Sequence, residues 1–143
     1  MTLVDANLLL YAYDSSSPQH EPARKWLEST LSEPEPSAFA WMTILAFLCI
    51  GTNPRALRQP LSVADALEIV SEWLSRANIV VVNPTERHWE IFRGLVVKGQ
   101  AQSSLISDAH LATLAIEHGA ILATTDRDFT RFPGLRILNP LEA

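Results

Sequence analysis

Short apolar runs suited to β-strands alternate with longer stretches of helical spacing along the whole chain. Strands are expected at 2–4, 37–40, 79–82, 121–124 and 135–138. Helices are expected at 7–13, 18–31, 42–50, 62–76, 86–98 and from 108 to about 118. Strict alternation of this kind predicts an α/β fold, with a central, mostly parallel sheet flanked by helices on both faces. The β-branched run at 79–82 favours a central strand covered on both sides.

Capping residues predict where several of these helices begin and end. Ser17 precedes a proline that suits the first helical position, and Ser62 with Asp65 forms a capping-box pattern. Thr85 and Ser107 are expected to cap the helices at 86–98 and 108–118. The loop at 99–104 is polar and is expected to be mobile.

The bulk properties indicate a single globular domain spanning residues 1–143. The chain is 48% hydrophobic and 19% charged, which fits a folded protein and not a disordered one. Its one cysteine, Cys49, lies in an apolar run and is expected to be a core thiol. We find neither a signal-peptide pattern nor an apolar stretch long enough to span a bilayer, so a cytoplasmic protein without a membrane anchor is expected.

Four aspartates follow apolar runs or open a helix, namely Asp5, Asp108, Asp126 and Asp128. In a parallel sheet, strand exits and helix starts converge at one edge, so these carboxylates are expected to meet there. Like charges at 4 Å repel by roughly 4 kcal/mol per pair at an effective dielectric near 20. A hard divalent cation such as Mg²⁺ or Mn²⁺ offsets this repulsion, which predicts a metal-dependent enzyme acting on phosphate esters.

Each of these residues also has a structural interpretation. Asp126 and Asp128 could form an Asx-turn. Asp5 could be a ligand that Asn7 orients, but simple capping is the structural alternative, because both residue types are favoured at helix starts. Thr124 would place a hydroxyl near the metal, although a lone strand threonine is ordinarily structural. The net charge of −5 argues against a protein that coats nucleic acid through diffuse positive charge, but it does not exclude a nuclease.

Other groups that could carry chemistry are scattered. The four histidines do not have the spacing of a zinc site and are expected at the surface or at helix ends. The four tryptophans are expected in the core rather than as base-stacking platforms. Arg127 and Arg131 lie beside the last aspartates, where they are either solvated surface residues or contacts for RNA.

With these residues in view, the chain resembles the PIN-domain ribonucleases, and among them the VapC toxins of bacterial toxin–antitoxin pairs. The resemblance runs from Val4 to Pro140. It is carried by five motifs: VDANLL at 4–9, DAHLA at 108–112, AIEHG at 115–119, TTDRDF at 124–129 and FPGL at 132–135. Each motif is weak alone, but their order and spacing together are specific.

The resemblance implies a PIN fold in which Asp5, Asp108 and Asp126 hold Mg²⁺ or Mn²⁺ and Asp128 assists. It also implies hydrolysis of single-stranded or loop RNA, a cognate VapB-like antitoxin and a homodimer. Thr124 matches the family's hydroxyl residue near the metal, and Asn7 matches its supporting asparagine.

One departure from the family pattern concerns a helix after the second strand, where many members carry a glutamate. Ala46 stands at that position. Its presence leaves open weaker metal binding, one ion in place of two, or a silent PIN-like binding module. Glu117 is a poor substitute, because it lies nine residues beyond Asp108, about 13.5 Å along a helix.

A different enzyme class is a haloacid-dehalogenase-like phosphatase, in which an aspartate after the first strand is the nucleophile. That chemistry calls for a second acid two residues later and a downstream lysine near a strand end. Asn7 occupies the first position and Lys98 is in no such context.

Overall fold

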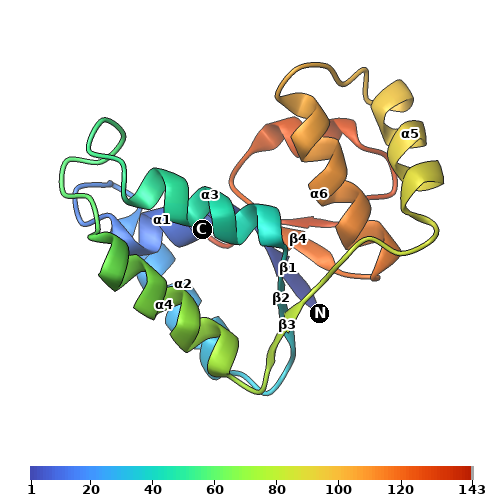
Figure 1. Ribbon diagram of the computed structural model, residues 1–143. Coiled ribbons are helices and arrows are strands. Elements are labelled where there is room, and N and C mark those ends of the chain that lie inside the picture. Colours follow the sequence, from blue (N-terminus) through green and yellow to red (C-terminus); the bar gives the residue numbers. More distant parts are fainter. Residues whose placement is uncertain (143) are drawn as a thin grey trace.

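The computed structural model describes residues 1–142 (Figure 1). Its strands are β1 (Thr2–Val4), β2 (Ser37–Phe39), β3 (Ile79–Val81), β4 (Ile121–Ala123) and β5 (Ile137–Leu138). Its helices are α1 (Ala6–Tyr13), α2 (His20–Ser32), α3 (Trp41–Gly51), α4 (Val63–Ser75), α5 (His88–Lys98) and α6 (Leu105–Glu117). A short 3-10 helix, η1 (Arg127–Arg131), links β4 to β5.

The five strands form one parallel sheet in the order β3-β2-β1-β4-β5. β1 therefore lies at the centre, between β2 and β4. Its register pairs Val4 with Ala123, so the residues that follow the two strands leave the sheet side by side. The expectation of a parallel α/β sheet with helices on both faces is confirmed.

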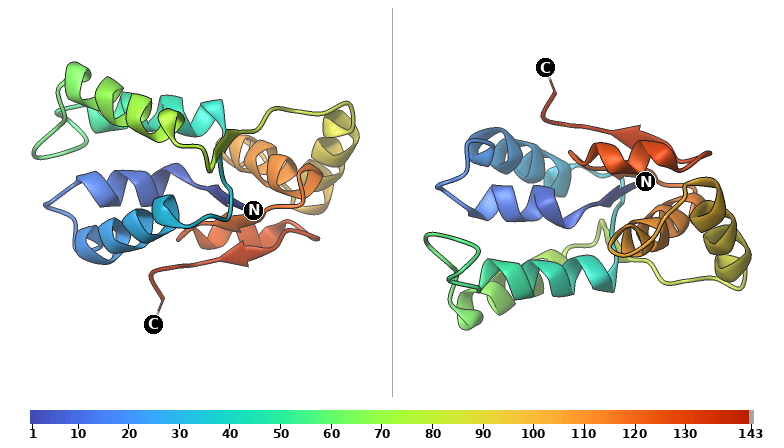
Figure 2. Two further views of the ribbon diagram at one scale, coloured as in Figure 1. Left: turned by 90° about the horizontal axis from the view of Figure 1, so that it is seen from below. Right: turned by 90° about the horizontal axis from the view of Figure 1, so that it is seen from above.

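Alternation along the strands divides the core into two parts (Figures 1 and 2). Val4, Phe39 and Ala123 point to the face covered by α1, α2, α3 and α4. Leu3 and Leu122 point to the other face, covered by α5, α6 and η1. The sheet edge between these two layers is where the strands end and the candidate site begins.

An aromatic cluster fixes the larger layer against the sheet. The indole of Trp73 is fully buried and contacts Phe39, Phe47 and Tyr13, with ring centroids 4.8 to 5.9 Å apart. Edge-to-face and tilted contacts at these separations are favourable beyond the area that they bury. The cluster therefore anchors α1, α3 and α4 to β2, and with them the first turn after β1.

The assignment of the run at 79–82 to a central strand was wrong. β3 is an edge strand, and Val80 is 41% exposed. β-branched residues favour any pleated, half-buried surface, so composition alone does not separate an edge from a centre.

Three of the expected helix starts were also wrong. α6 begins at Leu105, so Ser107 lies inside its first turn and does not cap it. α5 begins at His88, and the Thr85 hydroxyl instead accepts the Arg87 N–H in the turn before the helix. α2 begins at His20, after a turn in which the Ser17 hydroxyl accepts the Gln19 N–H.

The ends of two other helices follow the sequence pattern. The Ser62 hydroxyl accepts the Asp65 N–H at 3.0 Å, as the capping pattern at α4 predicts. Gly119 adopts φ +65° after α6, the left-handed geometry that favours glycine.

Exposure corrects two further expectations. Cys49 is exposed and is not a core thiol. Trp41 and Trp89 are 50% and 64% exposed, so two of the four tryptophans lie largely outside the core. Both residues sit on outward sides of helices α3 and α5, where a run of apolar residues does not reveal which face is buried. Within the described residues, we find no helix with the length and apolar character needed to cross a membrane.

Candidate active site

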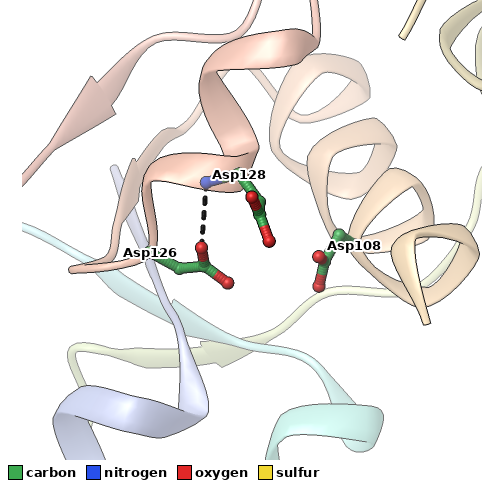
Figure 3. Close-up of side chains that lie close together, drawn as sticks. All are labelled: Asp108, Asp126 and Asp128. Carbon is green, nitrogen blue, oxygen red and sulfur yellow. Dashed lines mark hydrogen bonds between the residues drawn. The ribbon is translucent and has the colours of Figure 1, made fainter. Parts of the chain in front are cut away.

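Three carboxylates converge where β4 ends and α6 begins (Figure 3). Asp126 and Asp128 follow β4, and Asp108 projects from the first turn of α6 toward them. One carboxylate oxygen of each lies within 4.8 Å of the others. Parallel sheets bind ligands at this edge, because strand exits and helix starts open there together.

The turn after β4 orients two of these acids. The Asp126 Oδ1 atom accepts the Asp128 N–H at 2.9 Å and caps η1 (Figure 3). The structure therefore contains both the predicted Asx-turn and the acidic cluster. One carboxylate oxygen of Asp126 holds the turn, and its second oxygen remains for a ligand.

A hydrogen-bond chain ties Asp5 to the same site. The Thr124 hydroxyl donates to Asp5 Oδ2 at 2.7 Å and accepts the Asp126 N–H at 3.0 Å. Asp5 Oδ1 accepts the Ala6 N–H at 2.8 Å and so caps α1. Thr124 is 1% exposed, so the chain is shielded from water and fixes the distance between the ends of β1 and β4.

Burial and mutual repulsion disfavour negative charge in this cluster. Burial, with the charges of Asp126, Asp5 and Asp128, raises the pKa of Asp108 to about 6. Burial also raises the pKa of Asp5, while the hydrogen bonds from Thr124 and Ala6 act in the opposite direction. Groups that resist ionisation in the bare protein are the ones that a cation stabilises most.

The donor set fits a hard divalent cation. It consists of carboxylate oxygens from three side chains on two fixed elements, which is the chemistry that Mg²⁺ and Mn²⁺ prefer. Asp5 stands just outside this closest group, although its charge acts on Asp108. Asn7 lies in the first turn of α1, and within residues 1–142 it forms no hydrogen bond with Asp5.

The two arginines beside the aspartates differ in how they are held. Arg131 Nη1 donates to the Gly99 carbonyl at 2.8 Å, and its charge lowers the pKa of Asp108. The Arg127 side chain is 89% exposed and lies 3.8 Å from the Glu142 carboxylate. Arg131 is thus a positioned cation at the site, while Arg127 is a solvated one.

The expectation that all four histidines are surface or capping groups was wrong for His88 and His110. The Glu117 carboxylate is bonded to the Thr85 N–H and to His88 Nδ1. His88 Nε2 in turn lies 3.0 Å from His110 Nδ1. Glu117 does not join the aspartates. The sequence did contain a signal for these contacts: His110 and Glu117 are seven residues apart, which places them two turns apart on one face of α6.

The raised pKa of Asp108 leads to a prediction about pH and stability without metal. The folded pKa of about 6 lies above the ordinary 3.8, so the folded state holds the proton more tightly than the unfolded chain. Ionised Asp108 therefore costs stability above pH 6, and this cost disappears as the pH falls from 6 toward 3.8. Asp108→Asn should raise the melting temperature in chelator by a few degrees near neutral pH, on the order of 1 kcal/mol after solvent screening.

The gain should shrink toward about pH 5 and reverse in millimolar Mn²⁺, which stabilises only the wild-type site. Glu86→Gln, an exposed carboxylate away from the cluster, is the matched control. A melting difference between Asp108→Asn and wild type that is independent of pH would contradict the electrostatic account.

The Thr124 hydroxyl gives a second prediction. Thr124→Val keeps the shape but removes the hydrogen-bond donor of the Asp5 Oδ2 atom, which should cost on the order of 1–3 kcal/mol at neutral pH. It should also weaken Mn²⁺ binding, because the ends of β1 and β4 are no longer tied. Thr124→Ser keeps the hydroxyl and should retain most of the affinity. Equal Mn²⁺ affinities for the two variants in calorimetry would refute the role of the hydrogen bond.

Comparisons with known proteins place this geometry in a family. Residues 2–135 match the model of the PIN domain. The chain is 40% identical over 136 residues to ribonuclease VapC37 of Mycobacterium tuberculosis, covering 95% of this chain and 94% of that protein. It is 38% identical over 141 residues to ribonuclease VapC33 of the same organism, covering 99% of both.

Solved structures agree with this at the level of the fold. A DNA-bound VapBC of Salmonella typhimurium superposes with a TM-score of 0.68 at 18% identity, covering 97% of each chain. VapC20 of M. tuberculosis, a toxin that cleaves the sarcin–ricin loop, gives 0.65 at 15% identity over 95% of this chain and 99% of that one. From the match along nearly its whole length, the chain belongs to the VapC ribonucleases of the PIN-domain family.

Proposed function

We propose that this protein is an Mg²⁺- or Mn²⁺-dependent endoribonuclease that acts as the toxin of a VapBC-type toxin–antitoxin pair. The observation that carries the proposal is the convergence of Asp108, Asp126 and Asp128 at the carboxyl edge of the sheet. Family membership supplies the reaction class, a hydrolase of RNA, in place of the phosphatase alternative.

The protein's part in the reaction is to hold the cation and to orient the RNA phosphate beside it. A bound divalent ion supplies Lewis-acid polarisation of the scissile phosphate and activation of the attacking water. Asp108, Asp126 and Asp128 are the ligands that the geometry favours, and Asp5 supports them through Thr124. Because the pKa of Asp108 is about 6, loading the ion near that pH also displaces a proton from this carboxyl.

Arg131 is the residue best placed to meet a substrate phosphate. Its guanidinium is anchored by the Gly99 carbonyl, and it lies close enough to Asp108 to lower the pKa of that group. An anchored guanidinium loses little side-chain entropy when it binds an anion. Arg127 is too exposed to be held in one orientation, so we assign it at most a screened attraction to RNA.

We also propose that a VapB-like antitoxin inhibits the enzyme by placing a guanidinium among the aspartates. Several solved relatives are toxin–antitoxin complexes, among them VapBC2 of Rickettsia felis. A carboxylate cluster without its cation attracts an arginine fork. A homodimer is part of the same proposal by family likeness.

The competing function is a silent PIN-like binding module, which the alanine at position 46 favours. Ala46 lies on α3, whose first turn begins directly after the end of β2. A glutamate there would add a fourth acid from a third element. The present site has one ligand group fewer than many relatives, so the choice between a weakened nuclease and a binding module depends on measured cleavage.

The first prediction from this proposal concerns Asp126→Asn. The asparagine Oδ1 still accepts the Asp128 N–H, so the turn is preserved while one negative ligand is lost. RNA cleavage should fall by roughly 100-fold or more, since loss of outer partners of a metal alone costs about 10- to 100-fold. Purified protein is incubated with total RNA and Mn²⁺, and the cut ends are mapped. Full activity in Asp126→Asn beside the control Glu86→Gln would exclude the proposed site.

The second prediction concerns Ala46→Glu. If the absence of this acid leaves the cation with fewer protein ligands, RNA cleavage by the wild-type protein should need millimolar Mg²⁺. Cleavage should be faster with Mn²⁺, which binds such ligands more strongly. Restoring the acid should tighten Mn²⁺ binding in calorimetry by roughly tenfold, about 1.4 kcal/mol. Ala46→Gln, which has the same shape without the charge, should not. Unchanged or weaker affinity in a folded Ala46→Glu protein would refute this account.

A further inference from the structure

A second concave site lies on the other side of the first turn of α6. It is a pocket of about 490 Å³ that is lined by residues from the N-terminal halves of α3, α5 and α6. Its walls include Met42 of α3, His88, Trp89 and Phe92 of α5, and Ser107 and His110 of α6. The lining contains no carboxylate, so this pocket is chemically unlike the aspartate cluster.

One wall is a platform of flat rings. The imidazole of His88 stacks on Phe92 with an interplanar angle of 10° and centroids 5.9 Å apart. Trp89 lies 5.9 Å from the same phenyl ring and is 64% exposed. An indole left largely in water beside other aromatic rings is a surface on which a planar ligand can stack.

The pocket also contains one oriented polar group, next to these rings. The Glu117 side chain is fully buried and its carboxylate only accepts hydrogen bonds, which fixes a proton on His88 Nδ1. His88 Nε2 then pairs with His110 Nδ1 at 3.0 Å. The Nε2 atom of His110 is the ring nitrogen that has no partner within the described residues.

The pocket lies next to the candidate active site, because consecutive residues of α6 belong to the two sites. Ser107 lines the pocket and Asp108 belongs to the acidic cluster, and both lie in the first turn of α6. Successive helical residues diverge by about 100° with a rise of 1.5 Å, so the two sites flank the same turn. An RNA strand whose phosphate lies at Asp108 can therefore place the adjoining base in this pocket.

We propose that the pocket holds one unpaired nucleobase of the RNA substrate, stacked on Trp89 and Phe92 and hydrogen-bonded to His110 Nε2. The assignment rests on the proposed ribonuclease function and adds a subsite to it. A nucleobase has the two features that match this lining, a flat π-face for the aromatic rings and hydrogen-bonding atoms on its edge for His110. An apolar segment of a second copy would cover Trp89 equally well but would leave the His110 nitrogen buried and unpaired.

The test measures binding apart from cleavage, in an Asp126→Asn background. Short fluorescein-labelled homopolymers of A, C, G or U are titrated by anisotropy against Trp89→Ala, Trp89→Phe and Trp41→Ala. Trp41 is the matched control, an exposed tryptophan that does not line the pocket. Trp89→Ala should weaken binding by roughly 5- to 100-fold, Trp89→Phe much less, and Trp41→Ala hardly at all.

Two further measurements separate the base from the backbone and the stack from the hydrogen bond. A homopolymer with an abasic sugar at each position should bind the parent and Trp89→Ala alike, because it has no base to stack. His110→Leu should reduce the difference in affinity among the four homopolymers while retaining binding through Trp89. In mapped cut ends, a base preference at one fixed distance from the cut should flatten in both variants.

The possible outcomes are decisive. Equal affinities of Trp89→Ala and its parent for every homopolymer would overturn the subsite, whether or not the wild-type protein cleaves RNA. Dissociation of a dimer by Trp89→Ala in sedimentation, with loss of abasic binding as well, would assign the pocket to a second copy. Absence of cleavage by the wild type, with the Trp89 effect on binding intact, would refute the proposed function and leave the base pocket standing.

Discussion

Parallel pairing of β1 with β4 is the constraint on which the site depends. Because Val4 pairs with Ala123, Asp5 and Thr124 leave the sheet as neighbours, and the Asp5 N–H continues the ladder to the Ala123 carbonyl at 3.0 Å. The Thr124 hydroxyl then joins the two strand ends, and the turn that positions Asp126 follows directly. A slip of one strand by one residue would exchange the two faces on which its side chains pack and would separate these groups.

The cluster is a place where folding works against local electrostatics. Burial and like charges disfavour ionisation of Asp5 and Asp108, yet the sheet and α6 hold both carboxylates where they are. The aromatic layer around Trp73 and the apolar face of α6 supply packing that offsets the free-energy cost of holding these carboxylates together. Stability is therefore concentrated in the core, and the edge of the sheet remains dependent on a counter-charge. Enzymes commonly combine a stable core with a destabilised active site. A site that was already stable without its ion would gain little free energy by binding one.

Much of this arrangement was predictable from the sequence. Strand and helix alternation gave the parallel sheet, and the four aspartates at strand exits and a helix start gave the position of the acidic cluster. Apart from the three helix starts, most of the failures concern how far an element or one of its sides is exposed. The run at 79–82 is apolar at every position, so its sequence does not distinguish a central strand from an edge strand. Cys49, Trp41 and Trp89 lie in apolar stretches, and only tertiary packing determines which of their residues face outward. The contact of His88 with His110 joins residues 22 apart on two helices, and no local pattern reports such a pair.

The first turn of α6 is where these constraints meet. On one side, Arg131 binds the Gly99 carbonyl in the loop that leads into the helix, and a side chain added at Gly99 would lie 2.9 Å from the ring of Phe132. On the other side, His110 is held by His88 and through it by the buried Glu117. A helix free to rotate would carry Asp108 away from the other aspartates and relieve the repulsion. Because α6 is fixed from both sides, the carboxylate stays in the cluster, and that rigidity preserves a site for a cation.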